Sequence, residues 1–282
     1  MSTPLEPWQE GVYLKREDVH ELGAFKWRGA LPTLERWGTD VVTASTGNHG
    51  AATAWAARRV GVRATVFVPE GASATKLALL EQLDAELHVV AGDFDDAKDA
   101  ARAFADDRGI PFFEDGVEPA QLEGYGRIGE EIVEQLGRPP AAVVVPVGNG
   151  ALLAGIGRAL GPGVRRVGVA AEAAPVMAES WHAGRVVADD RCATIADGLA
   201  VRVAIPEAVD WLLEYADELL TVSEDALKAG VAELWRNGIR AEPSAAAALA
   251  ALPRVPERPV VLIVTGRNID DALLADCLAA AG

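Results

Sequence analysis

Lys26 lies in the segment GAFKWRGA (residues 23–30), among small and apolar neighbours, where a lysine amine could act as a nucleophile. Desolvation in such surroundings disfavours the ammonium form and favours the neutral amine. A neutral amine can attack a carbonyl and form a Schiff base. The alternative is a surface lysine at the start of a helix, with its aliphatic chain lying over Phe25 and Trp27. Taken alone, these residues favour the surface lysine.

A second segment that could do chemistry is STGNHG (residues 45–50), between a predicted strand and a predicted helix. Its small residues allow backbone N–H groups to point at an anion, and the helix dipole adds to the attraction. The side chain of Asn48 can both donate and accept hydrogen bonds. The alternative is an ordinary helix start capped by Thr46 or Asn48. The segment alone favours this alternative.

The third segment is GNGAL (residues 148–152), which follows the apolar run AVVVPV and opens a helix. Backbone N–H groups in such a turn can hold a phosphate. The segment is not a dinucleotide-binding fingerprint, because Leu153 stands where the third glycine is required. It is not a P-loop either, because no Gly-Lys-Ser/Thr follows. A structural turn and a phosphate site are equally compatible with these residues.

The elements that must position these segments alternate between apolar strands and helices. Continuous apolar strands of this kind predict parallel sheets covered on both faces, and ligands at the carboxyl ends of the strands. The predicted strands are 41–45, 64–68, 87–90, 112–113, 142–147, 166–171 and 260–265. The predicted helices are 50–60, 75–83, 95–107, 126–136, 151–160, 226–235 and 244–252.

Composition narrows the classes of protein. The 282 residues carry 26 Lys and Arg against 42 Asp and Glu, a formal net charge of −16, which argues against nucleic acid and anionic membranes as partners. Cys192 and Cys277 belong to no CxxC or Cys/His cluster, so a disulfide framework and a thiolate zinc site are not expected. The sequence shows no secretory signal and no apolar run of about 20 residues. We expect a soluble cytoplasmic protein.

Taken together, these segments resemble the fold-type II pyridoxal-phosphate enzymes and, within them, the serine/threonine dehydratases or threonine ammonia-lyases. The resemblance covers nearly the whole chain and rests on the order and spacing of seven segments: KRED (15–18), GAFKWRGA (23–30), STGNHG (45–50), VPVGNGALLAG (145–155), ATIADGL (193–199), EPS (242–244) and TGRN (265–268). It implies a two-domain α/β fold like that of the tryptophan synthase β chain. Residues 1–37 and 120–282 would form the large cofactor-binding domain and residues 38–119 the small one, with pyridoxal 5′-phosphate between them. It also implies a homodimer; with no regulatory domain expected after the last strand, feedback through one is not expected.

The resemblance assigns a role to each matching residue. Lys26 would hold the cofactor as a Schiff base and act as the catalytic base, and Asn48 would bond the 3-hydroxyl oxygen of the cofactor. Thr265 would face the pyridine nitrogen. The phosphate would be bound by Gly148, Asn149, Gly150, Ala151 and Leu152, and the substrate carboxylate by Ser45, Thr46, Gly47 and His49.

The expected reaction is β-elimination from a hydroxy amino acid such as L-threonine or L-serine, giving a 2-oxo acid and ammonia. A neutral hydroxyl at the ring nitrogen makes the cofactor a milder electron sink, which favours loss of a β-leaving group. The GNG turn and Arg267 leave open β- or γ-replacement of the threonine-synthase or cysteine-synthase type. A racemase and a non-catalytic binding protein are further alternatives. No metal site is expected, because Ala178 stands where a metal-binding relative has an Asp downstream of Glu172.

Overall fold

The computed structural model describes residues 1–72 and 74–280, and the side chains of residues 74 and 75 are not described. The chain divides into two compact units, one of residues 1–25 and 125–282 and one of residues 26–124. The first helix, α1 (Trp27–Trp37), is grouped with the smaller unit because it packs against α2 (Asn48–Val60). The domain division at residues 37 and 120 stays a prediction.

The larger unit is built on a six-stranded sheet within the described residues. Its strand order is β1 (Leu5–Gln9), β2 (Val12–Arg16), β9 (Val260–Val264), β6 (Ala142–Pro146), β7 (Arg165–Ala171) and β8 (Glu218–Val222). All neighbouring strands are parallel except the edge pair β1 and β2. The predicted parallel sheet is therefore confirmed, and the antiparallel edge hairpin, β8 and several helices are additions to it.

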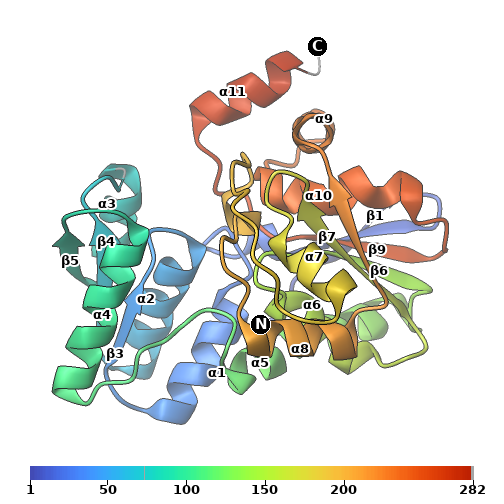
Figure 1. Ribbon diagram of the computed structural model, residues 1–282. Helices are drawn as coiled ribbons and strands as arrows, with labels where there is room; N and C mark the ends of the chain where they lie inside the picture. The colour runs from blue at the N-terminus through green and yellow to red at the C-terminus, as the bar shows by residue number, and fades with distance from the viewer. Residues whose placement is uncertain (73, 281–282) are drawn as a thin grey trace. The chain divides into compact units, whose positions relative to one another are not determined.

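Both faces of this sheet are buried, which is why its central strands are apolar at every position. Val144 and Leu262 face a core shared with α10 (Pro243–Ala251), while their neighbours Val143 and Val261 are equally buried on the other face. Figure 1 shows α10 on one side of the sheet and α6 (Ala151–Leu160) on the other. The other helices of this unit are α7 (Val176–Ala183), α8 (Pro206–Tyr215), α9 (Glu224–Arg236) and α11 (Asp271–Ala280).

The smaller unit contains a parallel sheet of β3 (Val41–Ala44), β4 (Ala64–Pro69) and β5 (Glu86–Val90). Figure 1 shows α2, α3 (Ala74–Gln82) and α4 (Phe94–Arg108) around it. A capping box starts α4, because the Asp93 carboxylate accepts from the N–H groups of residues 95 and 96. Two parallel-rich sheets flanked by helices confirm the predicted α/β fold. None of the described helices has the length and hydropathy that a membrane crossing requires.

Two predicted elements, the strand at residues 112–113 and the helix at residues 126–136, differ from the structure in length. Residues 112–113 make only a bridge to β3: Val42 donates to the Pro111 carbonyl at 3.0 Å, and Phe113 donates to the Val42 carbonyl at 2.7 Å. The ladder stops there because the Phe113 carbonyl accepts from side chains instead, those of Thr43 and His49. The helix predicted from residue 126 starts earlier, as α5 (Pro119–Leu136), so its glycines lie inside the helix.

Candidate functional site

Lys26, in the smaller unit, combines low exposure with a carboxylate partner. It lies immediately before α1, with only 16% of its side-chain surface exposed, and its Nζ forms an ion pair with Asp115. The residue before it, Phe25, is hydrogen-bonded within the other unit, where its N–H donates to the Thr265 carbonyl at 3.1 Å. Lys26 is thus a half-buried amine with a carboxylate partner, which the surface-lysine alternative did not anticipate.

Asp115 is a site residue that the sequence reasoning missed. The Gln121 side chain holds it: Gln121 Oε1 accepts from the Gly116 N–H at 2.9 Å, so the amide nitrogen faces Asp115 Oδ1 at 3.1 Å. Burial alone would raise the pKa of Asp115, but the charges of Lys26 and His49 and the hydrogen bonds from Lys26 and Gln121 outweigh it and lower the pKa to about 2. Asp115 is therefore a carboxylate at any working pH.

His49 lies beside this ion pair and is buried. Its Nε2 is 3.1 Å from the Phe113 carbonyl oxygen, and its Nδ1 is 3.6 Å from Asp115 Oδ1. Burial lowers the pKa of His49, and the Lys26 charge lowers it further, against the opposing effect of Asp115. Because the ring is engaged here, a contribution of His49 to a substrate carboxylate would come from its backbone N–H.

The free energy of unfolding is expected to fall at acidic pH, because Asp115 becomes protonated there. Its pKa is about 2 in the folded protein against 3.8 normally, so the folded state binds fewer protons between these values. The stabilisation is complete above about pH 4, is lost as the pH falls toward 2, and amounts to about 2 kcal/mol. Urea unfolding should show the gap between wild type and Asp115→Asn shrinking below about pH 4. With the exposed Asp99→Asn as control, a gap that does not change with pH would contradict the assignment.

The loop of Ser45, Thr46 and Gly47 follows β3 and leads into α2, as predicted. The Gly47 N–H donates to Ser45 Oγ at 3.2 Å, and no side chain caps α2 among the described residues. A Cβ at Gly50 would lie 2.4 Å from the Ser45 carbonyl oxygen, so only glycine permits this tight turn. The helix start therefore places backbone N–H groups at the carboxyl end of the strand, which suits an anion, and the half-buried Asn48 lies in the same turn.

The GNGAL turn lies in the larger unit, between β6 and α6. Gly150 has a φ of +96°, and a Cβ at Gly148 would lie 2.3 Å from the Gly198 carbonyl oxygen. Both glycines are therefore required by the backbone. The Asn149 side chain accepts from the Ala151 N–H at 3.1 Å, so it occupies one of the donors at the start of α6. The turn offers Leu152 and its neighbours as further backbone donors to an anion.

Thr265 follows β9 in the same unit, and β9 is the parallel neighbour of β6. Its residue is 3% exposed, and its Oγ1 is buried without a hydrogen-bond partner among the described residues. A buried hydroxyl in that state costs free energy unless a ligand or water satisfies it. The arrangement thus provides a hydroxyl ready to bond a further group.

Segments that are separate in sequence meet around this turn. The Ser244 Oγ accepts from the Gly198 N–H at 3.0 Å, and Gly198 is in turn the neighbour of Gly148. The Glu242 carboxylate accepts from the Asn268 N–H at 3.2 Å and packs against Gly266. The ATIADGL, EPS and TGRN segments therefore contact one another around the GNGAL turn and hold its backbone in position.

A family model described as "Pyridoxal-phosphate dependent enzyme" matches residues 2–266. The chain belongs to the pyridoxal-phosphate-dependent enzymes. The L-threonine ammonia-lyase of Geobacter sulfurreducens is 35% identical to it over 273 residues, 92% of this chain and 67% of that protein. The catabolic L-threonine dehydratase TdcB of Escherichia coli is 31% identical over 275 residues, 92% of this chain and 83% of that protein.

Solved structures agree. The processed form of threonine deaminase isoform 2 from Solanum lycopersicum matches with a TM-score of 0.94 at 29% identity, over 100% of this chain and 88% of that one. Structures of serine racemase and of diaminopropionate ammonia-lyase share the fold. The chain is a pyridoxal-phosphate-dependent enzyme of the fold-type II class, related to the threonine dehydratases.

The residues of this pyridoxal-phosphate-dependent enzyme fit its cofactor. Lys26 is an amine that can bond an aldehyde, and the GNGAL turn opens helix α6, whose first backbone N–H groups suit a phosphate. The Thr265 hydroxyl, buried without a partner among the described residues, matches a ring nitrogen. Within residues 1–72 and 74–280, no group of three or more His, Cys, Asp or Glu could hold a metal ion.

Gly148→Ala is expected to destabilise this pyridoxal-phosphate-dependent enzyme by about 1–3 kcal/mol, because the new Cβ overpacks against the Gly198 carbonyl. Affinity for the cofactor should fall as well. Urea unfolding and a pyridoxal phosphate titration measure the two effects. Gly163→Ala is the matched control, since a Cβ there meets nothing within 4 Å. Equal stability and equal cofactor affinity in the two variants would contradict the close packing of Gly148 against the Gly198 carbonyl.

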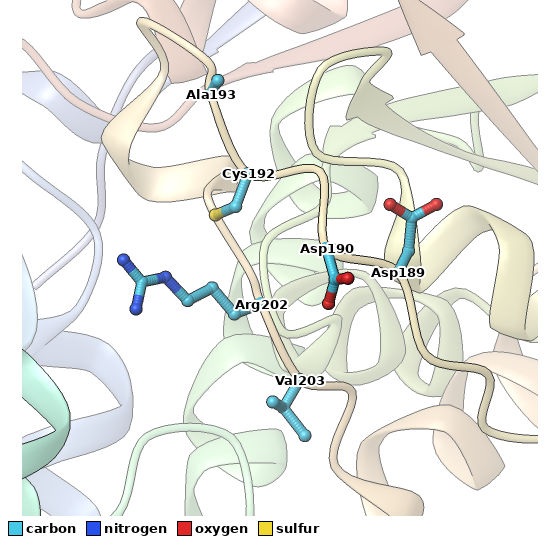
Figure 2. A pocket seen from close by; sticks show the side chains of 6 residues that line it. All are labelled: Asp189, Asp190, Cys192, Ala193, Arg202 and Val203. Atoms are coloured by element: carbon cyan, nitrogen blue, oxygen red, sulfur yellow. The ribbon is translucent and has the colours of Figure 1, made fainter.

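A hollow of about 490 Å³ lies elsewhere in the larger unit and is lined by Asp189, Asp190, Cys192, Ala193, Arg202 and Val203. Figure 2 shows that these side chains come from two neighbouring stretches of irregular chain. Asp189 is already paired with Arg191 at 2.5 Å. None of the predicted site residues lines this hollow, and its two carboxylates do not suit an anionic cofactor.

Proposed function

We propose that this enzyme eliminates water from a hydroxy amino acid such as L-threonine or L-serine and releases a 2-oxo acid and ammonia. The threonine ammonia-lyase and dehydratase names of its relatives support the substrate class. The observation that carries the reaction type is the buried Thr265 hydroxyl, which has no partner among the described residues. A neutral hydroxyl leaves a ring nitrogen weakly protonated, which favours elimination over reactions that need a long-lived carbanion.

Bound pyridoxal phosphate supplies an aldehyde that condenses with amines and a ring that withdraws electrons from the α carbon. The residues proposed to hold it are Lys26, Asn48, the turn from Gly148 to Leu152, and Thr265. The backbone donors of the turn bind the phosphate, and Asn48 donates to the 3-hydroxyl oxygen. The hydroxyl of Thr265 bonds the ring nitrogen and thereby sets how strongly the ring draws electrons.

The chain's own residues do the rest. Ser45, Thr46, Gly47 and the His49 backbone N–H bind the substrate carboxylate at the start of α2. Lys26 Nζ, once released as a neutral amine, takes the α proton as general base. The carboxylate of Asp115 provides a fixed negative charge for the Lys26 ammonium that results.

The function is tested by supplying the cofactor-loaded enzyme with L-serine, L-threonine, their D forms and their O-phosphorylated and O-acetylated derivatives. Formation of 2-oxo acid is measured. We expect release from a free hydroxy amino acid. Product only from an activated derivative, or only with an added nucleophile, would overturn the proposal in favour of β- or γ-replacement. Interconversion of D and L forms without 2-oxo acid would overturn it in favour of a racemase.

The proposal includes a homodimer that works in the cytoplasm and uses two domains divided at residues 37 and 120. Size-exclusion chromatography with light scattering measures the mass in solution. A monomer would contradict the dimer without affecting the proposed reaction.

A further inference from the structure

A lysine that bonds a carbonyl must first lose a proton, so the groups around Lys26 decide where that proton goes. Besides the Gln121 amide, two ionisable nitrogen-bearing side chains lie beside the Asp115 carboxylate. Its Oδ2 pairs with Lys26 Nζ, and its Oδ1 is 3.6 Å from His49 Nδ1. The carboxylate thus stands between an amine that must give up a proton and an imidazole.

The Phe113 carbonyl determines which nitrogen of His49 carries hydrogen. A carbonyl oxygen only accepts, so His49 Nε2, at 3.1 Å, must be the donor. That carbonyl is itself held, because the Phe113 N–H donates to β3 at 2.7 Å and the Thr43 hydroxyl donates to the same carbonyl oxygen at 2.9 Å. In the neutral ring the lone pair of Nδ1 therefore faces the carboxylate.

This leaves two acceptors, His49 Nδ1 and Asp115 Oδ1, turned toward one another in a buried place. A proton between them would remove the mismatch and draw the atoms to the usual hydrogen-bond distance of about 3 Å. The Asp115 carboxylate cannot turn away freely, because Gln121 donates to Oδ1 at 3.1 Å. A single added proton on His49 Nδ1 would therefore turn this contact between two acceptors into a hydrogen bond.

We propose that His49 and Asp115 act as a proton-holding pair for Lys26: when the Lys26 ammonium releases a proton to water, His49 Nδ1 takes one up, and the Asp115 carboxylate stabilises the positive charge at either nitrogen. The inference rests on the proposed function, which makes Lys26 the amine that bonds the cofactor. The N–H bond of Lys26 Nζ breaks, an N–H bond forms at His49 Nδ1, and Asp115 stays a carboxylate. During turnover the α proton makes Lys26 an ammonium, and His49 keeps its own proton; His49 gives that proton back to water only when Lys26 regains an ammonium without taking an α proton. His49 and Asp115 are positioning residues in this scheme.

The charges around His49 shift its pKa in the directions that the proposal requires. The charged groups facing His49 are Lys26, Asp115 and Glu114. Glu114 is committed to Lys98 at 2.5 Å and to Arg102 at 2.6 Å. The Lys26 charge lowers the pKa of His49, and the Asp115 charge raises it. When Lys26 loses its charge, the balance moves toward a protonated His49.

The test is nitrogen NMR of the histidine rings in the full chain, which contains four histidines. In the cofactor-free wild type we expect His49 to carry hydrogen on Nε2 at neutral pH. In Lys26→Met, the midpoint of His49 titration should rise by about one pH unit or more, because a nearby positive charge is gone. In Asp115→Asn it should fall. The ring of His88, whose Nε2 is 3.0 Å from Glu86 Oε1, is the control histidine.

Hydrogen on Nδ1 in the wild type would overturn the inference, and this measurement needs no variant to fold. An unchanged His49 midpoint in Lys26→Met would overturn it as well. Adding pyridoxal phosphate to the wild type provides a separate reading, in which the near-visible absorbance reports loading and the His49 signals should shift to the protonated form. Absence of loading would count against the proposed function alone, because the cofactor-free measurements still decide the role of His49. Loading without protonation of His49 would count against the inference alone.

Discussion

Replacing Lys26 by alanine is expected to lower turnover of a hydroxy amino acid by about 10³-fold or more, because the variant loses both the nucleophile and the general base. Steady-state 2-oxo acid formation measures the effect. The same change also leaves the Asp115 carboxylate without the Lys26 side of its ion pair, so a loss of stability is expected in addition.

Lys26→Arg separates the two consequences. The guanidinium keeps a positive charge toward Asp115 but does not become a nucleophile under ordinary conditions. We therefore expect Lys26→Arg to unfold near the urea midpoint of the wild type while remaining inactive. Lys76→Ala on α3 is the control for a lysine outside the site and should keep full activity. Retained turnover in either Lys26 variant would refute the assigned role.

Much of the architecture was predictable because it depends on local periodicity. Strands buried on both faces must be apolar at every position, and β6 and β9 are, so they were found within one residue of their ends. The turns after them were also predictable, since ligand loops follow the carboxyl ends of parallel strands. β2 escaped prediction because its Lys15 and Arg16 interrupt the apolar pattern.

Asp115 was not predictable from a motif, because its partner Lys26 is 89 residues earlier in the chain and the FED stretch has no distinctive spacing. One signal was present. Asp115 follows the apolar pair 112–113, which bridges β3, so it stands where the strand-end rule places ligand residues. A two-residue bridge is too short to show a period, and only the fold reveals that it ends beside the start of α1.

The KRED segment shows the opposite outcome, a resemblance motif whose residues support the fold. Lys15 is completely buried on β2, and its Nζ donates to the Thr3 carbonyl at 2.6 Å, to Glu131 at 2.6 Å and to Gln135 at 3.1 Å. Glu17 is also fully buried, and it accepts from the Thr3 hydroxyl at 2.6 Å. The charges of this segment fasten the chain's start to β2 and α5.

Lys15→Met is therefore expected to be among the most destabilising substitutions outside the site, at about 3–5 kcal/mol, because it leaves the Glu131 carboxylate, only 13% exposed, without its buried ammonium. Urea unfolding at neutral pH measures the loss. Removing both charges tests the cause. Lys15→Met combined with Glu131→Leu should recover a large part of the stability, because replacing a buried ion pair by apolar residues costs much less than breaking it. A double variant as unstable as the sum of the two single variants would show that packing around the Lys15 chain, and not the buried charge, carries the effect.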